Sequence, residues 1–114
     1  MKIHILRQPA TGQEIREMME ELQIYIKLAV DVERGVITGG GEYHADCEEV
    51  LLEEGSRQED IWGADWYPGS RRVEFVALIN IRPRQGNRGM EIEDPKLRTK
   101  IETIVRQWLD PESK

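Results

Sequence analysis

The architecture follows from residues 26–38, which read IKLAVDVERGVIT. Apolar side chains occupy every second position from Ile26 to Val32, a period of two that is typical of a strand with one buried face. Residues 33–35 (ERG) supply a turn with a glycine, and residues 36–38 (VIT) are β-branched enough to return as a partner strand. The stretch therefore predicts a β-hairpin.

Three helices are predicted outside this hairpin. The sequence TGQE, which starts at Thr11, has the spacing of a capping box, and the apolar residues after it predict a helix from about Gly12 to Gln23. Helical spacing returns from about Tyr43 to Glu54. The third helix is capped by Asp94 and carries an apolar stripe as far as Trp108.

Three further strands complete the pattern. Lys2 to Leu6 is expected to form a short edge strand, and Ile61 to Tyr67 a strand of the main sheet, although Gly63 interrupts it. The strongest strand pattern runs from Arg72 to Arg82 and is apolar on both sides near its centre. Strands that are apolar on both sides are usually central, so we expect this one in the middle of the sheet.

The order of the elements is therefore β-α-β-β-α-β-β-α. We predict an α+β fold, a two-layer sandwich in which three amphipathic helices cover one face of a mainly antiparallel sheet of about five strands. The length of 114 residues suits one domain, residues 1–110, followed by a loose tail, residues 111–114.

Composition excludes several classes of protein. The net charge is −6 with 33% charged residues, and no apolar run approaches the roughly 18 residues of a membrane span. The apolar stretch at the start is too short for a signal peptide. One cysteine excludes an internal disulfide and a multi-cysteine metal site. We expect a cytoplasmic protein that has no cofactor. We also expect that it binds neither a membrane nor a nucleic acid.

The first candidate site is His44 with Asp46 and Cys47. His44 and Cys47 are three residues apart, so on a helix they share a face and could bind one metal ion, or act as base and nucleophile. Both interpretations need additional groups that this segment lacks. The alternative is that Cys47 packs against the sheet as a small apolar residue.

A second candidate lies in residues 60–67, where carboxylates alternate with large aromatic side chains. Asp60 and Trp62 could line a pocket for a sugar, a base or a cation. The alternative is that Trp62 and Trp66, which share a strand face, belong to the core or to an interface.

The third candidate is residues 80–88, an arginine loop rich in guanidinium and amide groups. Such groups recognise carboxylates and phosphates, so the loop predicts a small anionic ligand. The alternative is a solvated loop or one fastened by internal ion pairs. The candidate ligand-binding side chains are Asn80, Arg82, Arg84, Asn87 and Arg88.

Charge is distributed unevenly along the chain. Residues 42–60 contain eight acidic residues against Arg57, and residues 71–88 contain five arginines against Glu74. These segments could neutralise each other within one chain or pair between two copies, and the second possibility predicts a homodimer.

Several stretches resemble a family of short bacterial proteins of unknown function. They are residues 39–48 (GGGEYHADCE), residues 58–63 (QEDIWG) and residues 79–92 (INIRPRQGNRGMEI). The resemblance covers about Ile26 to Leu109 and implies one compact bacterial domain. It implies no activity, cofactor or catalytic residue.

The function expected from these observations is an interaction or ligand-binding module without catalysis of its own. The alternative is a small hydrolase or metal-dependent enzyme that uses His44, Asp46 and Cys47, with Arg82, Arg84 or Arg88 holding an anionic substrate.

Overall fold

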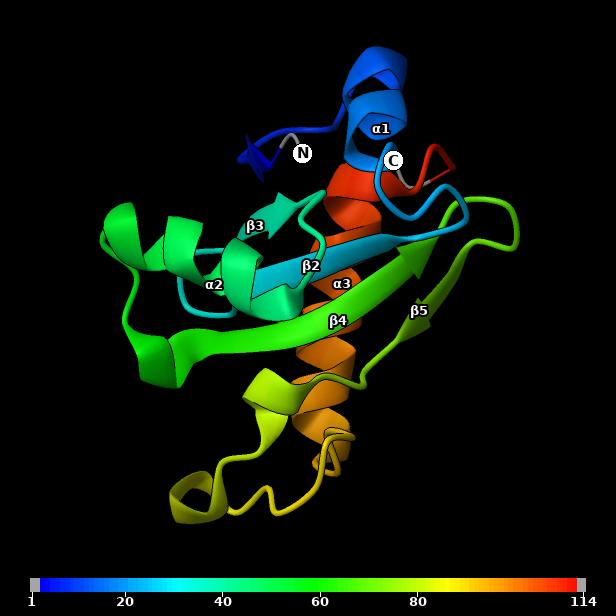
Figure 1. Ribbon diagram of the computed structural model, residues 1–114. Coiled ribbons are helices and arrows are strands. Elements are labelled where there is room, and N and C mark those ends of the chain that lie inside the picture. The colour runs from blue at the N-terminus through cyan, green and yellow to red at the C-terminus, as the bar shows by residue number, and fades with distance from the viewer. Residues whose placement is uncertain (1–2, 113–114) are drawn as a thin grey trace.

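The computed structural model describes residues 3–112, and its elements follow the predicted order (Figure 1). The α+β fold, with five strands and three helices, is confirmed. Of the predicted terminal segments, Lys2 and residues 113–114 lie outside the described part. The strands are β1 (His4–Leu6), β2 (Ile26–Asp31), β3 (Val36–Gly39), β4 (Ile61–Tyr67) and β5 (Arg72–Glu74), and the helices are α1 (Gly12–Met18), α2 (His44–Glu53) and α3 (Pro95–Leu109).

The sheet is antiparallel throughout, with the strand order β1-β3-β2-β4-β5. The hairpin predicted from residues 26–38 is present, with Asp31 opposite Val36. Its first strand, β2, is central and buried on both faces rather than on one. The buried Asp31 carboxylate accepts hydrogen bonds from the backbone N–H groups of Glu33 and Arg34, both at 2.9 Å, and these bonds hold the turn.

The prediction that Arg72–Arg82 forms a central strand is wrong. Only β5 pairs with the sheet, as a three-residue edge strand. The chain then leaves the sheet and forms a short 3-10 helix, η2 (Leu78–Asn80). Val76 and Leu78, which made the second face of the segment apolar, are exposed to solvent. The apolar pattern therefore reflects an uncovered surface, and not a strand that is buried on both sides.

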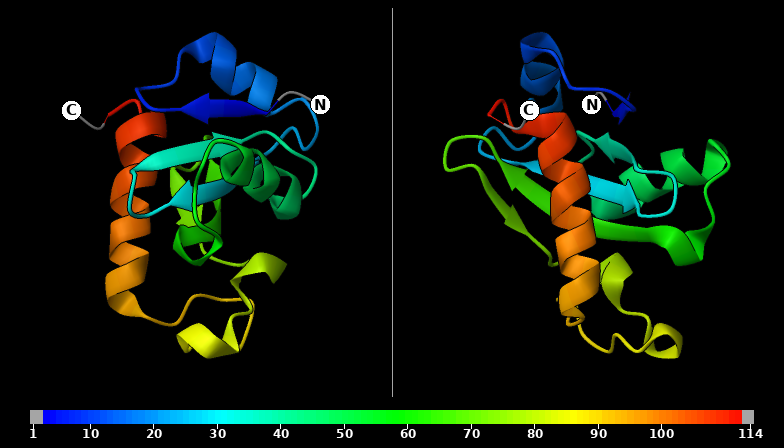
Figure 2. Two further views of the ribbon diagram at one scale, coloured as in Figure 1. Left: turned by 90° about the vertical axis from the view of Figure 1, so that its left-hand side faces the viewer. Right: turned by 180° about the vertical axis from the view of Figure 1, so that it is seen from behind.

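The expectation that all three helices share one face of the sheet is also wrong. Figure 2 shows α2 and α3 on opposite sides of the strands. The cause lies in β2 and β4, whose side chains are buried on both faces because successive side chains of a strand point in opposite directions. Ala29 and Ile61 pack with α2, whereas Val30 and Trp62 belong to the core on the α3 side.

The larger core lies between the sheet and α3. Trp66, which is almost fully buried, and Trp62 take part in it, so the predicted aromatic surface of β4 faces the interior. The α3 helix begins as predicted, with Pro95 in its first turn and the Asp94 side chain accepting from the backbone N–H of Lys96 at 2.9 Å. Its stripe ends in Leu109, which is buried in the same core.

The first helix, α1, is shorter than the sequence predicted. The Thr11 capping box is present, with the Thr11 hydroxyl accepting from the backbone N–H of Glu14 at 3.1 Å. The helix ends at Met18 because turns follow, and Gln23 adopts a φ of 66°, in the left-handed region. The segment joins the main core through Met18.

Candidate functional site

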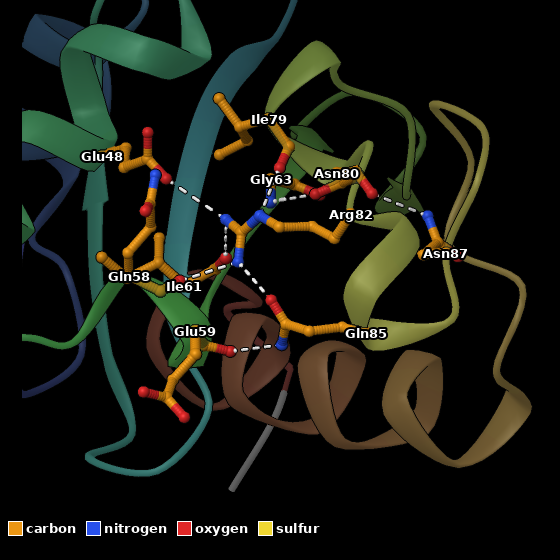
Figure 3. Close-up of polar contacts among 10 residues, drawn as sticks. All are labelled: Glu48, Gln58, Glu59, Ile61, Gly63, Ile79, Asn80, Arg82, Gln85 and Asn87. Atoms are coloured by element: carbon orange, nitrogen blue, oxygen red, sulfur yellow. Dashed lines mark hydrogen bonds and ion pairs between the residues drawn. The ribbon is translucent and has the colours of Figure 1, made fainter.

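The arginine loop is fastened to the body of the protein by Arg82 (Figure 3). Its guanidinium pairs with the Glu48 carboxylate of α2 at 3.2 Å, and each side chain is only 12% exposed. The other hydrogen bonds of the Arg82 guanidinium go mainly to backbone carbonyl oxygens. Burial lowers the pKa of Arg82, and the Glu48 carboxylate opposes this shift in part. The other acceptors of Arg82 are the carbonyls of Gln58 (2.7 Å), Ile61 (2.7 Å) and Ile79 (2.9 Å) and the amide oxygen of Gln85 (3.1 Å).

The amide side chain of Asn80 takes the place of a missing strand beside β4. Its oxygen accepts from the backbone N–H of Gly63 at 2.7 Å, and its nitrogen donates to the Gly63 carbonyl at 3.0 Å. Asn87 holds the far end of the loop in the same way, because its amide nitrogen donates to the Asn80 carbonyl at 2.8 Å. Both side chains are buried, so these bonds replace the lost backbone pairing.

These contacts define what the arginine loop offers to a ligand. Asn80, Arg82 and Asn87 use their polar groups within the chain, as one of the two sequence-based interpretations proposed. Arg84 and Arg88 are exposed and form no hydrogen bond or ion pair with the described part of the chain. The Arg82–Glu48 pair also joins the basic and acidic segments within one chain.

Cys47 lies in the small core between α2 and the sheet. It is fully buried beside Ala29 and Leu51, and burial raises the pKa of its thiol to about 11. Its neighbour Asp46 accepts from the backbone N–H of Tyr43 at 3.2 Å and so caps the helix. A thiol of this kind is protonated at neutral pH, which favours the packing interpretation over a nucleophile.

The third member of this group, His44, faces a different partner. Its Nε2 lies 2.7 Å from Oδ1 of Asp65 and 3.2 Å from the carbonyl oxygen of Ala64. Because both neighbours are acceptors, Nε2 carries the proton and donates it. The two side chains are 11% and 9% exposed, so α2 and β4 are joined by a nearly buried His44–Asp65 pair.

This pair lines a cavity whose volume is about 670 Å³. The floor is the sheet face that carries Asp65, and one wall is the start of α2 with Tyr43. The opposite wall is the segment that leaves the sheet after β5. We call this space the α2 cavity. Its lining residues are Tyr25, Lys27, Tyr43, His44, Ala45, Asp65, Glu74, Val76, Ala77, Leu78, Ile79 and Met90.

The polar side chains of the cavity floor form a row across three strands. Lys27 of β2 is directly opposite Asp65 of β4, which is directly opposite Glu74 of β5. Tyr25 precedes β2 and stacks on Tyr67, with ring centroids 4.9 Å apart. Two carboxylates against one ammonium group give this row an excess of negative charge. Burial raises the pKa of Tyr25, and the Asp65 and Glu74 carboxylates raise it further.

The side chains of the aromatic-acidic candidate, residues 60–67, do not come together in one site. Trp62 is buried under the Arg82 guanidinium, whose carbon lies 5.0 Å from the centre of a Trp62 ring, and it does not line the α2 cavity. Asp60 is part of a short 3-10 helix, η1 (Gln58–Asp60). Of this stretch, Asp65 alone lines the cavity.

A metal site does not form around His44. Among residues 3–112, no three histidine, cysteine, aspartate or glutamate side chains are grouped as a metal ion requires.

Most residues that line the α2 cavity were not predicted from the sequence. His44 was a candidate, whereas Tyr25, Glu74 and Met90 had no predicted role. The period of two in β2 was a usable signal, since it places Tyr25 and Lys27 on one face. The exposure of Val76 and Leu78 could not be predicted, because the alternation of apolar residues around them is also typical of a buried strand.

Comparison with known proteins gives a family and no activity. The family model described as "Protein of unknown function (DUF5674)" matches residues 4–108. The chain belongs to this family. The predicted resemblance to a family of unknown function is thus confirmed, and the match begins earlier than Ile26. No curated protein and no solved structure matches the chain.

One property bears on membranes. No helix within residues 3–112 has the length and apolar character needed to cross a bilayer.

Proposed function

We propose that this protein is a small ligand-binding module whose ligand occupies the α2 cavity. The observation that supports this most strongly is the cavity itself, which combines about 670 Å³ of space with a nearly buried His44–Asp65 pair. Small-molecule sites are commonly hollows of roughly 300–1,000 Å³ with apolar walls and a few polar groups. The ligand is therefore an organic molecule with an apolar body and a polar end.

The apolar body has a surface prepared for it. Val76, Leu78 and Met90 are 40%, 70% and 41% exposed, and all three line the cavity. Large apolar side chains gathered at a cavity with a polar floor are typical of a binding site. Residues Asn80 and Arg82 act as positioning residues, because their bonds hold the wall that carries Leu78.

The experiment is a titration with the neutral probe hexan-1-ol, followed by NMR of the methyl groups of Val76, Leu78 and Met90. In the variant Ala45→Trp, an indole is placed at an exposed position of α2 that lines the cavity. The matched control is Leu52→Trp, an exposed position of the same helix outside the cavity. We expect saturable shifts in the protein and in the control, and their loss in Ala45→Trp. Equal shifts in both variants, or none in the unmodified protein, would contradict the proposal.

A homodimer is a second proposal, supported by the exposure of Leu78. An apolar patch of this kind is also typical of a contact between proteins. Sedimentation velocity at low and high micromolar concentrations tests it, together with the variant Leu78→Glu. We expect a dimer that the substitution weakens, and a monomer at all concentrations would refute the dimer.

The enzyme alternative has less support. It needs a reactive thiol at Cys47, which is sealed in the core with a raised pKa. The His44–Asp65 pair supplies a base without a neighbouring nucleophile of this group. Ligand binding without turnover uses the same residues and needs no further group.

A further inference from the structure

We infer that the ligand of the α2 cavity is a cation, an organic amine whose ammonium group binds at Asp65 and whose alkyl chain lies against Val76 and Leu78. This inference rests on the proposed function and names the chemical class of its ligand. Four observations, taken in turn, support it.

The first observation is the carboxylate at the floor of the cavity. Oδ1 of Asp65 accepts from His44, whereas its Oδ2 has no hydrogen bond or ion pair with residues 3–112. Oδ2 is not among the fully buried side-chain atoms of residues 3–112 that lack a partner, so it is accessible from the cavity, and a carboxylate oxygen can accept two hydrogen bonds there. An ammonium group supplies three donors and the opposite charge.

The second observation is the repulsion between two neighbouring carboxylates. Asp65 and Glu74 are directly opposite each other on adjacent strands, and like charges in that position are destabilising. Arg72 pairs with Glu74 at 2.9 Å, and it is largely exposed to solvent. Within residues 3–112 Asp65 pairs with no lysine or arginine, and its partner His44 is charged only if it is protonated. A cation bound at Asp65 therefore relieves a repulsion that the sheet retains.

The third observation concerns Lys27, which among residues 3–112 supplies the one ammonium group that lines the cavity. Although Lys27 is directly opposite Asp65, its Nζ donates to the Glu42 carbonyl at 3.1 Å and lies 5.5 Å from the centre of the Tyr43 ring. The lysine is therefore held at the wall by other groups, and the floor carboxylate stays available for a ligand.

The fourth observation is the aromatic lining. Tyr25 and Tyr43 both line the cavity, and aromatic rings attract organic cations through their electron-rich faces. Tyr43 already holds one cation in this way, the Nζ of Lys27.

The N-terminal end of α2, by contrast, favours an anionic ligand, because helix N-termini carry partial positive charge. Here the Asp46 carboxylate already occupies that end, where it accepts from the Tyr43 backbone N–H at 3.2 Å. Of the charged side chains that line the cavity, the two carboxylates of Asp65 and Glu74 outnumber the one ammonium group of Lys27. The cavity therefore favours a positive ligand over the negative one expected at the arginine loop.

The test compares three probes with the same alkyl chain: hexylammonium, hexan-1-ol and hexanoate. Their dissociation constants are measured by methyl NMR on the folded protein at constant ionic strength. Two variants carry the argument, Asp65→Asn and Glu74→Gln. Glu49→Gln is the matched control, because it makes the same change of net charge at an exposed position of α2 outside the cavity.

We expect hexylammonium to bind at least tenfold more tightly than hexan-1-ol, and hexanoate to bind most weakly. Asp65→Asn removes the preference for ammonium, Glu74→Gln reduces it about threefold, and Glu49→Gln leaves it unchanged. Glu74 is a part-exposed edge-strand side chain, so its variant keeps the test decisive if Asp65→Asn does not fold. Equal binding of the ammonium and the alcohol, or tighter binding of hexanoate, overturns the inference but leaves the proposed function standing. Absence of binding by all three probes overturns both.

Discussion

Replacing Gly63 by alanine tests how the wall of the α2 cavity is attached to the sheet. A Cβ at Gly63 would lie 2.5 Å from the Cβ of Ala77 and 3.1 Å from Cγ1 of Ile79. Carbon atoms in contact are normally about 3.5–4.0 Å apart, so the segment would have to move by about 1 Å. Overpacking costs about 1–3 kcal/mol, and we expect Gly63→Ala near the upper limit because Asn80 holds the segment to the same glycine.

The variant Ala77→Gly removes the methyl group that causes the collision. Alone, Ala77→Gly lowers the free energy of unfolding by about 1.5 kcal/mol. The lost buried methyl group accounts for about 0.8 kcal/mol, and the greater backbone freedom of glycine in the unfolded chain for about 0.5–1 kcal/mol. Independent effects would add to about 4.5 kcal/mol in the double variant. Because the collision is then absent, we expect the double variant to lose only about 2 kcal/mol.

The assay is urea unfolding followed by tryptophan fluorescence, with the free energy of unfolding obtained by linear extrapolation. The prediction is a coupling of about 2.5 kcal/mol between positions 63 and 77. A double variant whose loss equals the sum of the single losses would refute the close approach of the loop to β4.

Four further tests concern Arg82, Cys47 and Asp110. Arg82→Ala leaves Glu48 and several carbonyl groups unpaired, so we expect a loss of about 3–5 kcal/mol in urea unfolding; a loss below about 1 kcal/mol would show that the loop is held by other groups. The rise of the Cys47 pKa from 9.0 to about 11 lowers the thiolate fraction at pH 8 about 100-fold. Iodoacetamide should therefore label Cys47 at least about 100-fold more slowly in the folded protein than in the urea-unfolded chain. Equal labelling rates would contradict the burial of Cys47. The same shift makes stability fall as pH rises from about 9 toward 11, because the unfolded thiol loses its proton first. A hydrogen bond from Arg71 is the main cause that lowers the pKa of Asp110 below 3.8. The contribution of Asp110 to the free energy of unfolding is therefore complete above pH 3.8 and is lost as the pH falls further. Asp110→Asn should flatten this dependence of stability on acid pH, and an unchanged pH profile would contradict the pairing.

The elements that the sequence predicts well are those fixed by neighbouring residues. The Thr11 capping box, the Asp94 cap and the hairpin of residues 26–38 depend on spacing within one segment, and all three are present. The α1 helix was predicted too long because apolar spacing continues past Met18, where the chain forms turns instead.

The errors arise where distant segments meet. Nothing local distinguishes a central strand from the segment 72–82, whose course depends on the bonds between Asn80 and Gly63. Likewise, the apolar face of α2 gives no indication of which side of the sheet it covers.

The candidate site shows the same division. His44 was a candidate in the sequence and Asp65 lies in the aromatic-acidic stretch of residues 60–67, but their pairing joins positions 21 residues apart in the chain. Arg82 has three backbone carbonyls among its acceptors, and these leave no trace in residue identity. The exposed Leu78 becomes informative only when its place beside the cavity is known.

The most direct test of the central claim, that the α2 cavity is a ligand site, is a crystal structure of the protein grown with hexylammonium. We expect the ammonium nitrogen within hydrogen-bonding distance of Oδ2 of Asp65, with the alkyl chain against Val76 and Leu78. An empty cavity at a saturating concentration, or a probe bound only at another surface, would contradict it.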